Sequence, residues 1–246
     1  MTSPAFRLDD ASGRMLPSCI MRILLALCLL VVPARAAEKI FADHFPVPAQ
    51  EWTSTGGNDY IRLEPGYTLV LEGKEDGKKT VLTITVLDQT QMVAGVETRV
   101  VEERETQNGQ LVELSRNFFA ATKSAKDVYY LGEDVDIYQN GKVTGHEGSW
   151  RAGENGAKYG LMMPGSVRVG ATYYQEQAGK IANDRAEIVS IDETLETPAG
   201  KFINCVKTEE TTPLEPGKKE YKLYAPGVGL VQDGSLVLVR KNSRSM

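Results

Sequence analysis

The sequence predicts an all-β protein in which a single antiparallel meander forms a curled sheet, an open barrel or a sandwich, with at most short helices. Three observations predict this fold class. Runs of β-favouring residues with alternating polarity recur along the chain. Asn-Gly, Asp-Gly and Pro-Gly pairs, which suit tight turns, separate these runs. Only one stretch, residues 175–188, is rich in helix formers, and there a short helix is the alternative.

The first strong strand pattern covers residues 80–87, with the sequence TVLTITVL. Leu82, Ile84 and Val86 fall on one face of this strand, and threonines fall on the other. Because successive side chains of a strand point to opposite faces, we expect the face with Leu82 to line the core.

The next two strands are predicted at residues 96–105 and 111–121. An Asn-Gly turn lies between them and makes them a hairpin. In the second strand, Val112, Leu114 and Phe118 are the expected core residues.

Three turns carry the most specific hairpin signal, at Asn108-Gly109, Asn140-Gly141 and Asp233-Gly234. Both central residues of a type I′ turn need positive φ, which Asn, Asp and Gly tolerate best. We therefore expect three hairpins at these positions. The remaining strands are predicted at residues 128–131, 135–138, 171–175, 186–191, 202–209, 221–224, 229–231 and 236–240.

The N-terminus has the pattern of a cleaved export signal. Ten apolar residues, 23–32, follow Met21-Arg22 and precede a small-residue cleavage pattern that ends at Ala36. A transmembrane helix would need about 20 apolar residues. We predict that residues 1–36 are a signal peptide, with Met21 as the true first residue. Residues 37–246 then form one β-rich domain that is periplasmic or secreted and has no transmembrane segment.

The charge and the cysteine content narrow the possible partners. The chain has a formal net charge of −5, and the leader removes more basic than acidic residues, so the mature chain is more acidic still. Phosphate backbones would repel it, and we expect no nucleic-acid partner. Cys205 is the one cysteine after the leader, so no internal disulfide is expected. We interpret it as a small buried residue, with a partner disulfide or a reactive thiol as the alternative.

Two segments resemble ligand loops and fail the test of spacing. Residues 73–80 (GKEDGKKT) are one residue short between the glycines of a phosphate-binding loop, so a charged hairpin tip is predicted there. Asp134 and Asp136 lack the third ligand and the glycine position of a calcium loop. His146 lies near a carboxylate and a hydroxyl, but neighbours on a strand point to opposite faces. We expect no catalytic residue, metal or cofactor, and predict that the protein is not an enzyme.

Aromatic and methionine residues gather between positions 150 and 174. Such side chains line adaptable apolar pockets, and they also fill ordinary cores. If the sheet curls around a pocket, the candidate ligand-binding residues are Trp150, Met162, Met163, Tyr173 and Tyr174.

Several stretches of residues 60–235 carry a family resemblance, in the pattern GYTLVLEG…YLGEDV…GHEGSW…PAGKF…YAPGVGLV. This pattern resembles a group of bacterial exported proteins of unknown function. The resemblance implies export and a β-rich fold, and it brings no assigned catalytic residue. The ending PAGKF…YAPGVGLV is loosely similar to periplasmic β proteins such as the half-barrel lipoprotein carriers.

Three functional hypotheses follow. The first is an exported protein that binds a lipid or another apolar ligand. The alternative is a structural or protein-interaction module of the cell envelope, whose partner would be an envelope protein. The third is a hydrolase that uses the scattered carboxylates or His146, and it requires three or more polar groups to converge in one cleft.

Overall fold

A computed structural model describes residues 39–242 of the chain. The predicted signal peptide and the start at Met21 lie outside the described residues and stay predictions. Within the described residues the fold is antiparallel and almost entirely β, which confirms the predicted fold class. The helical element there is one short 3-10 helix, η1 (Ala49–Glu51). Residues 39–242 contain no helix with the length and apolarity that a membrane span requires.

Sixteen strands build the sheet, and most of them pair with their neighbour in sequence. The first eight are β1 (Trp52–Thr53), β2 (Thr68–Glu75), β3 (Lys78–Val93), β4 (Val96–Gln107), β5 (Gln110–Thr122), β6 (Val128–Gln139), β7 (Lys142–Gly145) and β8 (Trp150–Arg151). The other eight are β9 (Lys158–Met163), β10 (Thr172–Tyr174), β11 (Glu176–Gln177), β12 (Arg185–Thr197), β13 (Gly200–Thr211), β14 (Glu220–Ala225), β15 (Gly229–Asp233) and β16 (Leu236–Asn242).

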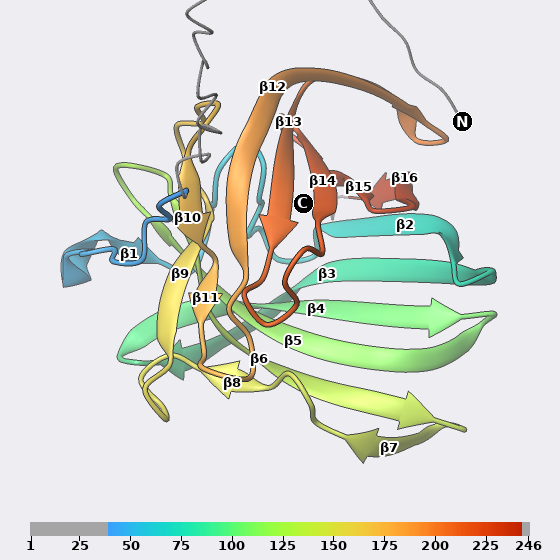
Figure 1. Ribbon diagram of the computed structural model, residues 1–246, viewed down its shortest axis with the longest axis horizontal. Helices are drawn as coiled ribbons and strands as arrows, with labels where there is room; N and C mark the ends of the chain where they lie inside the picture. The colour runs from blue at the N-terminus through green and yellow to red at the C-terminus, as the bar shows by residue number, and fades with distance from the viewer. Residues whose placement is uncertain (1–38, 243–246) are drawn as a thin grey trace, which may run out of the picture. The chain divides into compact units, whose positions relative to one another are not determined.

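The sheet curls until its two ends nearly meet (Figure 1). Its strand order is β10-β12-β13-β14-β15-β16-β2-β3-β4-β5-β6-β9-β11, while β1 pairs with β5, and β7 and β8 pair with β6. The end strand β11 pairs with β9, and β9 also contacts β10 at the opposite end of the path. A barrel-shaped, incompletely closed sheet results, with a space inside it.

The turn chemistry confirms two predicted hairpins fully and the third in part. Asn108-Gly109 joins β4 to β5 with φ of 50° and 82°, and Asn140-Gly141 joins β6 to β7 with φ of 53° and 73°. Asp233 ends β15 and pairs with Leu236, so the third turn begins one residue later than predicted. Of that Asp-Gly pair, only the glycine has positive φ.

A bulge in β6 corrects the prediction of two separate strands at residues 128–131 and 135–138. The strand is continuous, and its register with β5 shifts between the pairs Asn117–Glu133 and Phe119–Tyr130. Gly132 occupies the bulge with a φ of 148°. In a regular strand Tyr130 and Glu133 would point to opposite faces, but both line the same interior space here because of the extra residue.

The helix considered for residues 175–188 is absent. Residues 176–177 pair with β9 as strand β11, a turn follows, and β12 begins at Arg185. Gly179 in that turn has positive φ, which ends any helical path. Pairing with β9 therefore outweighs the local helix propensity of this stretch.

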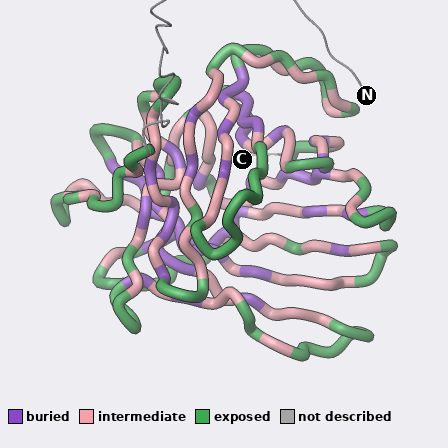
Figure 2. Tube along the Cα trace, in the orientation of Figure 1, coloured by how far each residue is buried: buried purple, intermediate pink, exposed green. Residues whose placement is uncertain are grey.

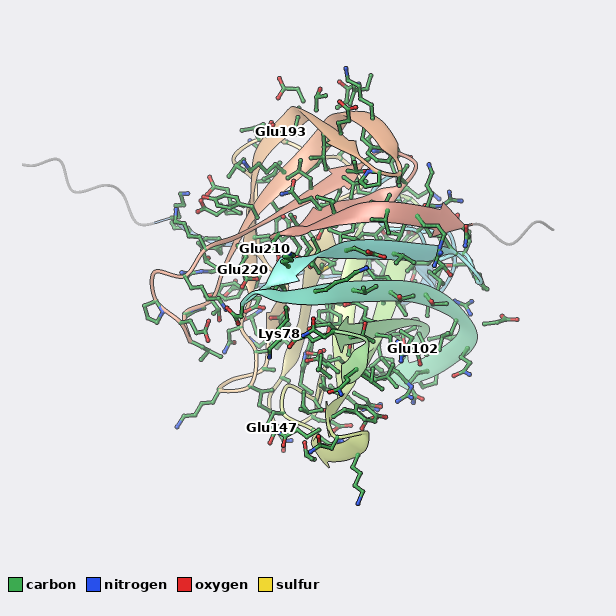
Figure 3. The ribbon with its side chains drawn as sticks, turned by 90° about the vertical axis from the view of Figure 1, so that its right-hand side faces the viewer. Lys78, Glu102, Glu147, Glu193, Glu210 and Glu220 are labelled. Carbon is green, nitrogen blue, oxygen red and sulfur yellow. The ribbon has the colours of Figure 1, made fainter. Side chains whose placement is uncertain are left out.

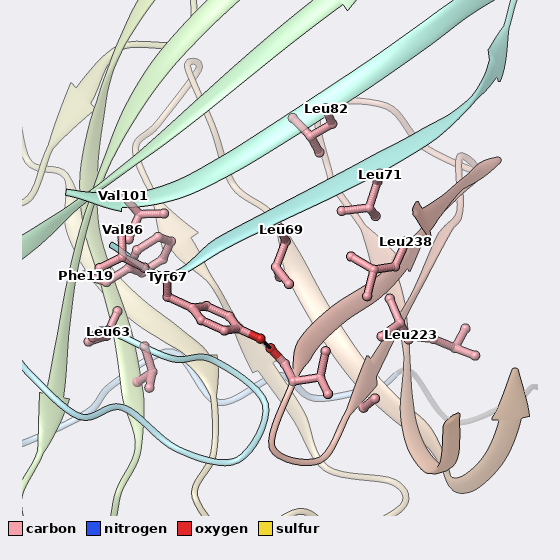
Figure 4. Close-up of a cluster of buried hydrophobic side chains, with 14 of the residues drawn as sticks. Leu63, Tyr67, Leu69, Leu71, Leu82, Val86, Val101, Phe119, Leu223 and Leu238 are labelled. Carbon is pink, nitrogen blue, oxygen red and sulfur yellow. Dashed lines mark hydrogen bonds between the residues drawn. The ribbon is translucent and has the colours of Figure 1, made fainter. Parts of the chain in front are cut away.

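Two apolar cores lie on opposite faces of the curled sheet. The first packs inside the curl and includes Leu82 and Val86, as predicted, with the Tyr67 hydroxyl donating to the carbonyl oxygen of Val228 at 2.7 Å (Figure 4). The second lies where the N-terminal segment covers β4, β5 and β6, and it contains Phe118 and Tyr129. Figure 2 shows the corresponding buried stretches, while the hairpin tips of β2 to β7 are exposed.

The bulge glycine generates the first prediction. A Cβ at position 132 would lie 2.5 Å from the carbonyl oxygen of Trp150, and the φ of 148° is unfavourable for an L side chain. We expect Gly132→Ala to lower the free energy of unfolding by about 3 kcal/mol, from overpacking and backbone strain together. Urea denaturation of the purified wild-type and variant proteins measures this change in the free energy of unfolding.

Gly109→Ala is the matched control, because that glycine has positive φ but an added Cβ meets nothing within 4 Å. Gly109→Ala should lower the free energy of unfolding by about 1 kcal/mol, from backbone strain alone. Equal losses in the two variants would contradict the role given to the bulge.

Candidate functional site

The inside of the curled sheet forms a cavity of about 230 Å³ that is partly open to solvent and has a mainly polar lining. We call it the polar compartment. Six of its lining residues are acidic: Glu103, Glu113, Glu133, Glu176, Asp184 and Glu210. Lys222 is its one basic lining residue.

An apolar compartment of about 100 Å³ adjoins the polar one. Its apolar lining includes Leu69, Ile84, Val86, Val101, Val228 and Leu230. Glu103, Phe119, Met162 and Lys222 line both compartments, so these four residues form the junction between them. The combined space has one apolar end and one strongly acidic end.

An open groove of about 300 Å³ leads from the polar compartment towards solvent. Asp184, Glu210 and Lys222 line both the groove and the compartment. Glu210 pairs across β13 and β14 with Glu220, which also lines the groove (Figure 3). The groove therefore gives a route into the interior from the side of β13 and β14.

The polar lining of β5 corrects the prediction for that strand in part. Val112, Leu114 and Phe118 were expected to face the core, but Glu113, Ser115, Asn117 and Phe119 line the interior space. Phe118 is buried on the opposite face, in the second core, where the guanidinium of Arg151 lies 4.7 Å from its ring centre. Phe118 is therefore a core residue, as predicted, whereas Val112 and Leu114 are only half-buried. The prediction did not foresee that the other face of the strand would line a polar interior.

A short hydrogen-bond chain fixes the wall made by β5 and β6. The Tyr130 hydroxyl donates to Oδ1 of Asn117 at 2.6 Å, and Nδ2 of Asn117 donates to Oγ of Ser115 at 3.2 Å. The rings of Tyr130 and Phe119 stack with their centres 4.9 Å apart. These contacts hold the polar wall rigid beside the junction.

The carboxylate of Glu210 is the best-satisfied acid of the compartment. Lys222 Nζ lies 3.2 Å from its Oε2, and the side chains of Gln175 and Thr208 each donate to its Oε1 at 3.2 Å. Lys222 also lies 3.8 Å from a carboxylate oxygen of Asp233. Burial opposes the charge on Lys222, but these two carboxylates raise its pKa well above the usual value.

Burial raises the pKa of the other acids of the compartment above their usual values. Burial raises the pKa of Glu103 to about 7, with Lys222 opposing the shift and Asp233 adding to it. Burial also raises the pKa of Glu133 to about 7, against the effect of the Tyr130 hydroxyl. Burial and the nearby Asp184 raise the pKa of Glu176 well above its usual value. At neutral pH Glu103 and Glu133 are therefore only partly ionised.

The structure does not bring the five predicted ligand-binding residues together. Met162 lies at the junction of the two compartments. Trp150 belongs to the second core and packs edge-on against Tyr130, and Met163 is fully buried. Tyr173 is buried in a small cluster with Ile188, and Tyr174 lies partly exposed against Phe41.

The remaining sequence candidates lie away from the cavity. Nδ1 of the exposed His146 lies 3.0 Å from a carboxylate oxygen of Asp136, and Asp134 forms an ion pair with Arg151. Cys205 is buried in the first core. Among residues 39–242, no three acidic, histidine or cysteine side chains are placed to hold a metal ion.

Sequence reasoning missed the acidic lining, although β5 carried a signal for it. Glu113, Ser115 and Asn117 are polar at every second position, which places them on one strand face. The lining residues from β4, β11 and β13 carry no such local signal, because only the curl of the sheet brings them together.

No protein-family model matches the chain, and comparisons with curated proteins and with solved structures found no match either. Inferences about function therefore rest on the residues and the geometry of the cavity.

The raised carboxyl pKa values generate a prediction about pH. A carboxyl whose pKa is higher in the folded than in the unfolded chain binds more protons when folded, so stability falls as pH rises between the two values. For Glu103 and Glu133 this window runs from about 4.5 to about 7. We expect the ligand-free protein to lose about 3 kcal/mol per carboxyl across the window, measured by urea denaturation at several pH values.

Glu103→Gln should flatten this pH dependence and stabilise the protein above pH 7, because the amide cannot ionise. Glu102→Gln is the control, since Glu102 is the neighbouring residue of β4 and pairs with Arg116 at 3.7 Å outside the cavity lining. Stability that rises between pH 5 and pH 8 would contradict the assignment.

Proposed function

We propose that the protein is an exported binding protein whose curled sheet holds a small amphipathic molecule. The observation that carries this proposal is the pair of adjoining compartments, one apolar and one acidic, which share four lining residues. Ligand sites are typically concave spaces of roughly 300 Å³ or more, lined by apolar residues with a few convergent polar groups. The two compartments together reach that size and have an apolar lining at one end, although their polar groups are more numerous than in a typical site.

The size of the apolar compartment limits the ligand's tail. A cavity of about 150 Å³ lined by apolar residues accommodates benzene, so a space of about 100 Å³ suits a segment of about four carbons. Burying four methylene groups contributes about 3 kcal/mol, which alone gives weak binding. A small amphipathic molecule therefore fits better than a long-chain lipid, and its polar head must supply the remaining affinity.

Export is part of the proposal because of the N-terminal apolar run and its cleavage pattern at Ala36. The resemblance to bacterial exported proteins supports the same compartment. Native mass spectrometry of protein purified from its natural source would show a co-purifying small molecule. Bare protein that also fails to bind short-chain amphiphiles would contradict the proposal.

A hydrolase is the second candidate, and one observation favours it. Its requirement that three polar groups converge in a cleft is met by Glu103, Glu133 and Glu176. Groups whose pKa lies near 7 suit general acid–base catalysis. His146 lies outside the cavity lining and has no part in this candidate. Conversion of a co-purified ligand by wild-type protein, but not by Glu133→Gln, would favour catalysis over binding.

A substitution at the junction tests the binding site directly. Met162 lines both compartments, so Met162→Trp should fill the junction and weaken binding of 1-hexanol or 1-hexylamine at least tenfold. Nuclear magnetic resonance titration of the full mature chain measures the affinity, because weak binding is expected.

Met92→Trp is the matched control, since Met92 is 58% exposed and lies outside both compartments. It should bind both probes as the wild type does. Unchanged binding in Met162→Trp, with its fold confirmed by the same spectra, would place the ligand elsewhere.

A further inference from the structure

We propose that the polar compartment recognises a small organic cation, an ammonium or guanidinium head, whose short apolar tail occupies the apolar compartment. This inference rests on the proposed binding function and specifies the chemical class of its ligand. It depends on three features: the charge of the cavity, the few hydrogen-bond partners of two buried groups in or near it, and its apolar extension.

The charge of the lining favours a cation. Acidic residues reach the compartment from five strands and one loop, whereas Lys222 is the one base among the lining residues. Its ammonium lies near Glu210 and Asp233, at the side of β13, β14 and β15. Glu113, Glu133 and Glu176 have no ion pair within the described residues, so the opposite wall of the compartment lacks a counter-charge.

Two buried groups have few hydrogen-bond partners: Glu176, which lines the cavity, and Tyr173, which lies outside the lining but close to Glu210. Glu176 is 3% exposed, and its one hydrogen bond within residues 39–242 comes from the backbone N–H of Asp184. The Tyr173 hydroxyl is 2% exposed and has no hydrogen-bond partner, and it lies near enough to Glu210 for that carboxylate to raise the phenol pKa. Leaving buried polar groups unpaired is costly. An ammonium offers three donors, which suit carboxylate and phenol oxygens.

The same geometry argues against the other charged ligands. A carboxylate or phosphate head would meet six acidic lining residues and a single lysine. No three acidic side chains in the described part of the chain converge to bind a metal ion. The apolar compartment borders the acids at Phe119 and Met162. It suits the apolar tail of an organic cation, which a bare ion lacks.

Binding of a cation is linked to proton release. The charged groups that line the two compartments are Glu103, Glu113, Glu133, Glu176, Asp184, Glu210 and Asp233, with the bases Lys222 and Arg62. Tyr60, Tyr67, Tyr130 and Tyr224 are the phenols of the lining, and Tyr173 lies close to Glu210. Several of these carboxyls are partly protonated at pH 7, and they must ionise to pair with a cation. Affinity for an amine therefore rises with pH, by up to about tenfold per pH unit for each proton released.

Three six-carbon probes test the head group: 1-hexylamine, 1-hexanol and hexanoate. About four carbons of each would occupy the apolar compartment, and the rest would span the junction to the polar one. The full mature chain is titrated with each by nuclear magnetic resonance at pH 6, 7 and 8. We expect hexylamine to bind at least tenfold more tightly than hexanol at pH 8, and hexanoate to bind most weakly. The affinity for hexylamine should rise from pH 6 to pH 8, and that for hexanol should stay constant, because the alcohol carries no charge.

The three probes separate the failure of this inference from the failure of the proposed function. If hexanol or hexanoate binds saturably at the cavity and hexylamine binds no more tightly, the cationic head is wrong and the binding function stands. If none of the three binds, both fail.

Two substitutions locate the head group within the compartment. Glu133→Gln should lower the affinity for hexylamine at least fivefold and leave the affinity for hexanol unchanged. Glu102→Gln, outside the lining, should change neither affinity. Lys222→Met should strengthen hexylamine, because it removes the positive charge that repels the ligand's head. If Lys222→Met fails to fold, the comparison of Glu133→Gln with Glu102→Gln still tests whether the head group binds in the polar compartment. Loss of hexylamine binding in a folded Lys222→Met variant would overturn the proposal.

Discussion

The carboxyl groups enclosed by the curled sheet are the constraint to which the rest of the structure responds. A buried charge is costly unless it is paired, and a buried carboxyl without a partner retains its proton. The fold uses both solutions. Glu210 is paired with Lys222 and accepts further hydrogen bonds from Gln175 and Thr208. Glu103 and Glu133 remain partly protonated near neutral pH. An interior of this kind gives up stability that an apolar filling of the same volume would supply.

Stability therefore comes from other parts of the sheet. One apolar core fills the rest of the curl around residues such as Leu71 and Leu238, and the second lies on the opposite face of β4, β5 and β6. The N-terminal segment covers that outer face with Phe45 and Trp52, which pack edge-on against Tyr129. Because the central strands are covered on their outer face as well, their inner face can carry polar groups near the cavity. The acidic site depends on this second core as much as on its own hydrogen bonds.

Local sequence signals predicted well which residues form strands. They predicted poorly which residues from different strands pack together. The turn at Asn108-Gly109 and the apolar face of Leu82 and Val86 follow from residue type and alternation alone, and the structure confirms both. For β5 the prediction placed Phe118 in a core correctly but missed the polar interior face, because alternation shows which residues share a face but not which face lies inside. For the same reason, the five predicted pocket residues lie in different places: some in the cores, one near the surface and one at the cavity. Of these five, only Met162 lines the two compartments.

By itself, the sequence determined the class of fold, the positions of most strands and the absence of local ligand motifs. These properties depend on backbone preferences and on side-chain periods of two, which act between neighbours in the chain. Tertiary structure alone decided that acids from β4, β5, β6, β11 and β13 share one space with Lys222. The degree of curl and the bulge at Gly132 set that arrangement, and both arise from pairing between strands that are distant in sequence.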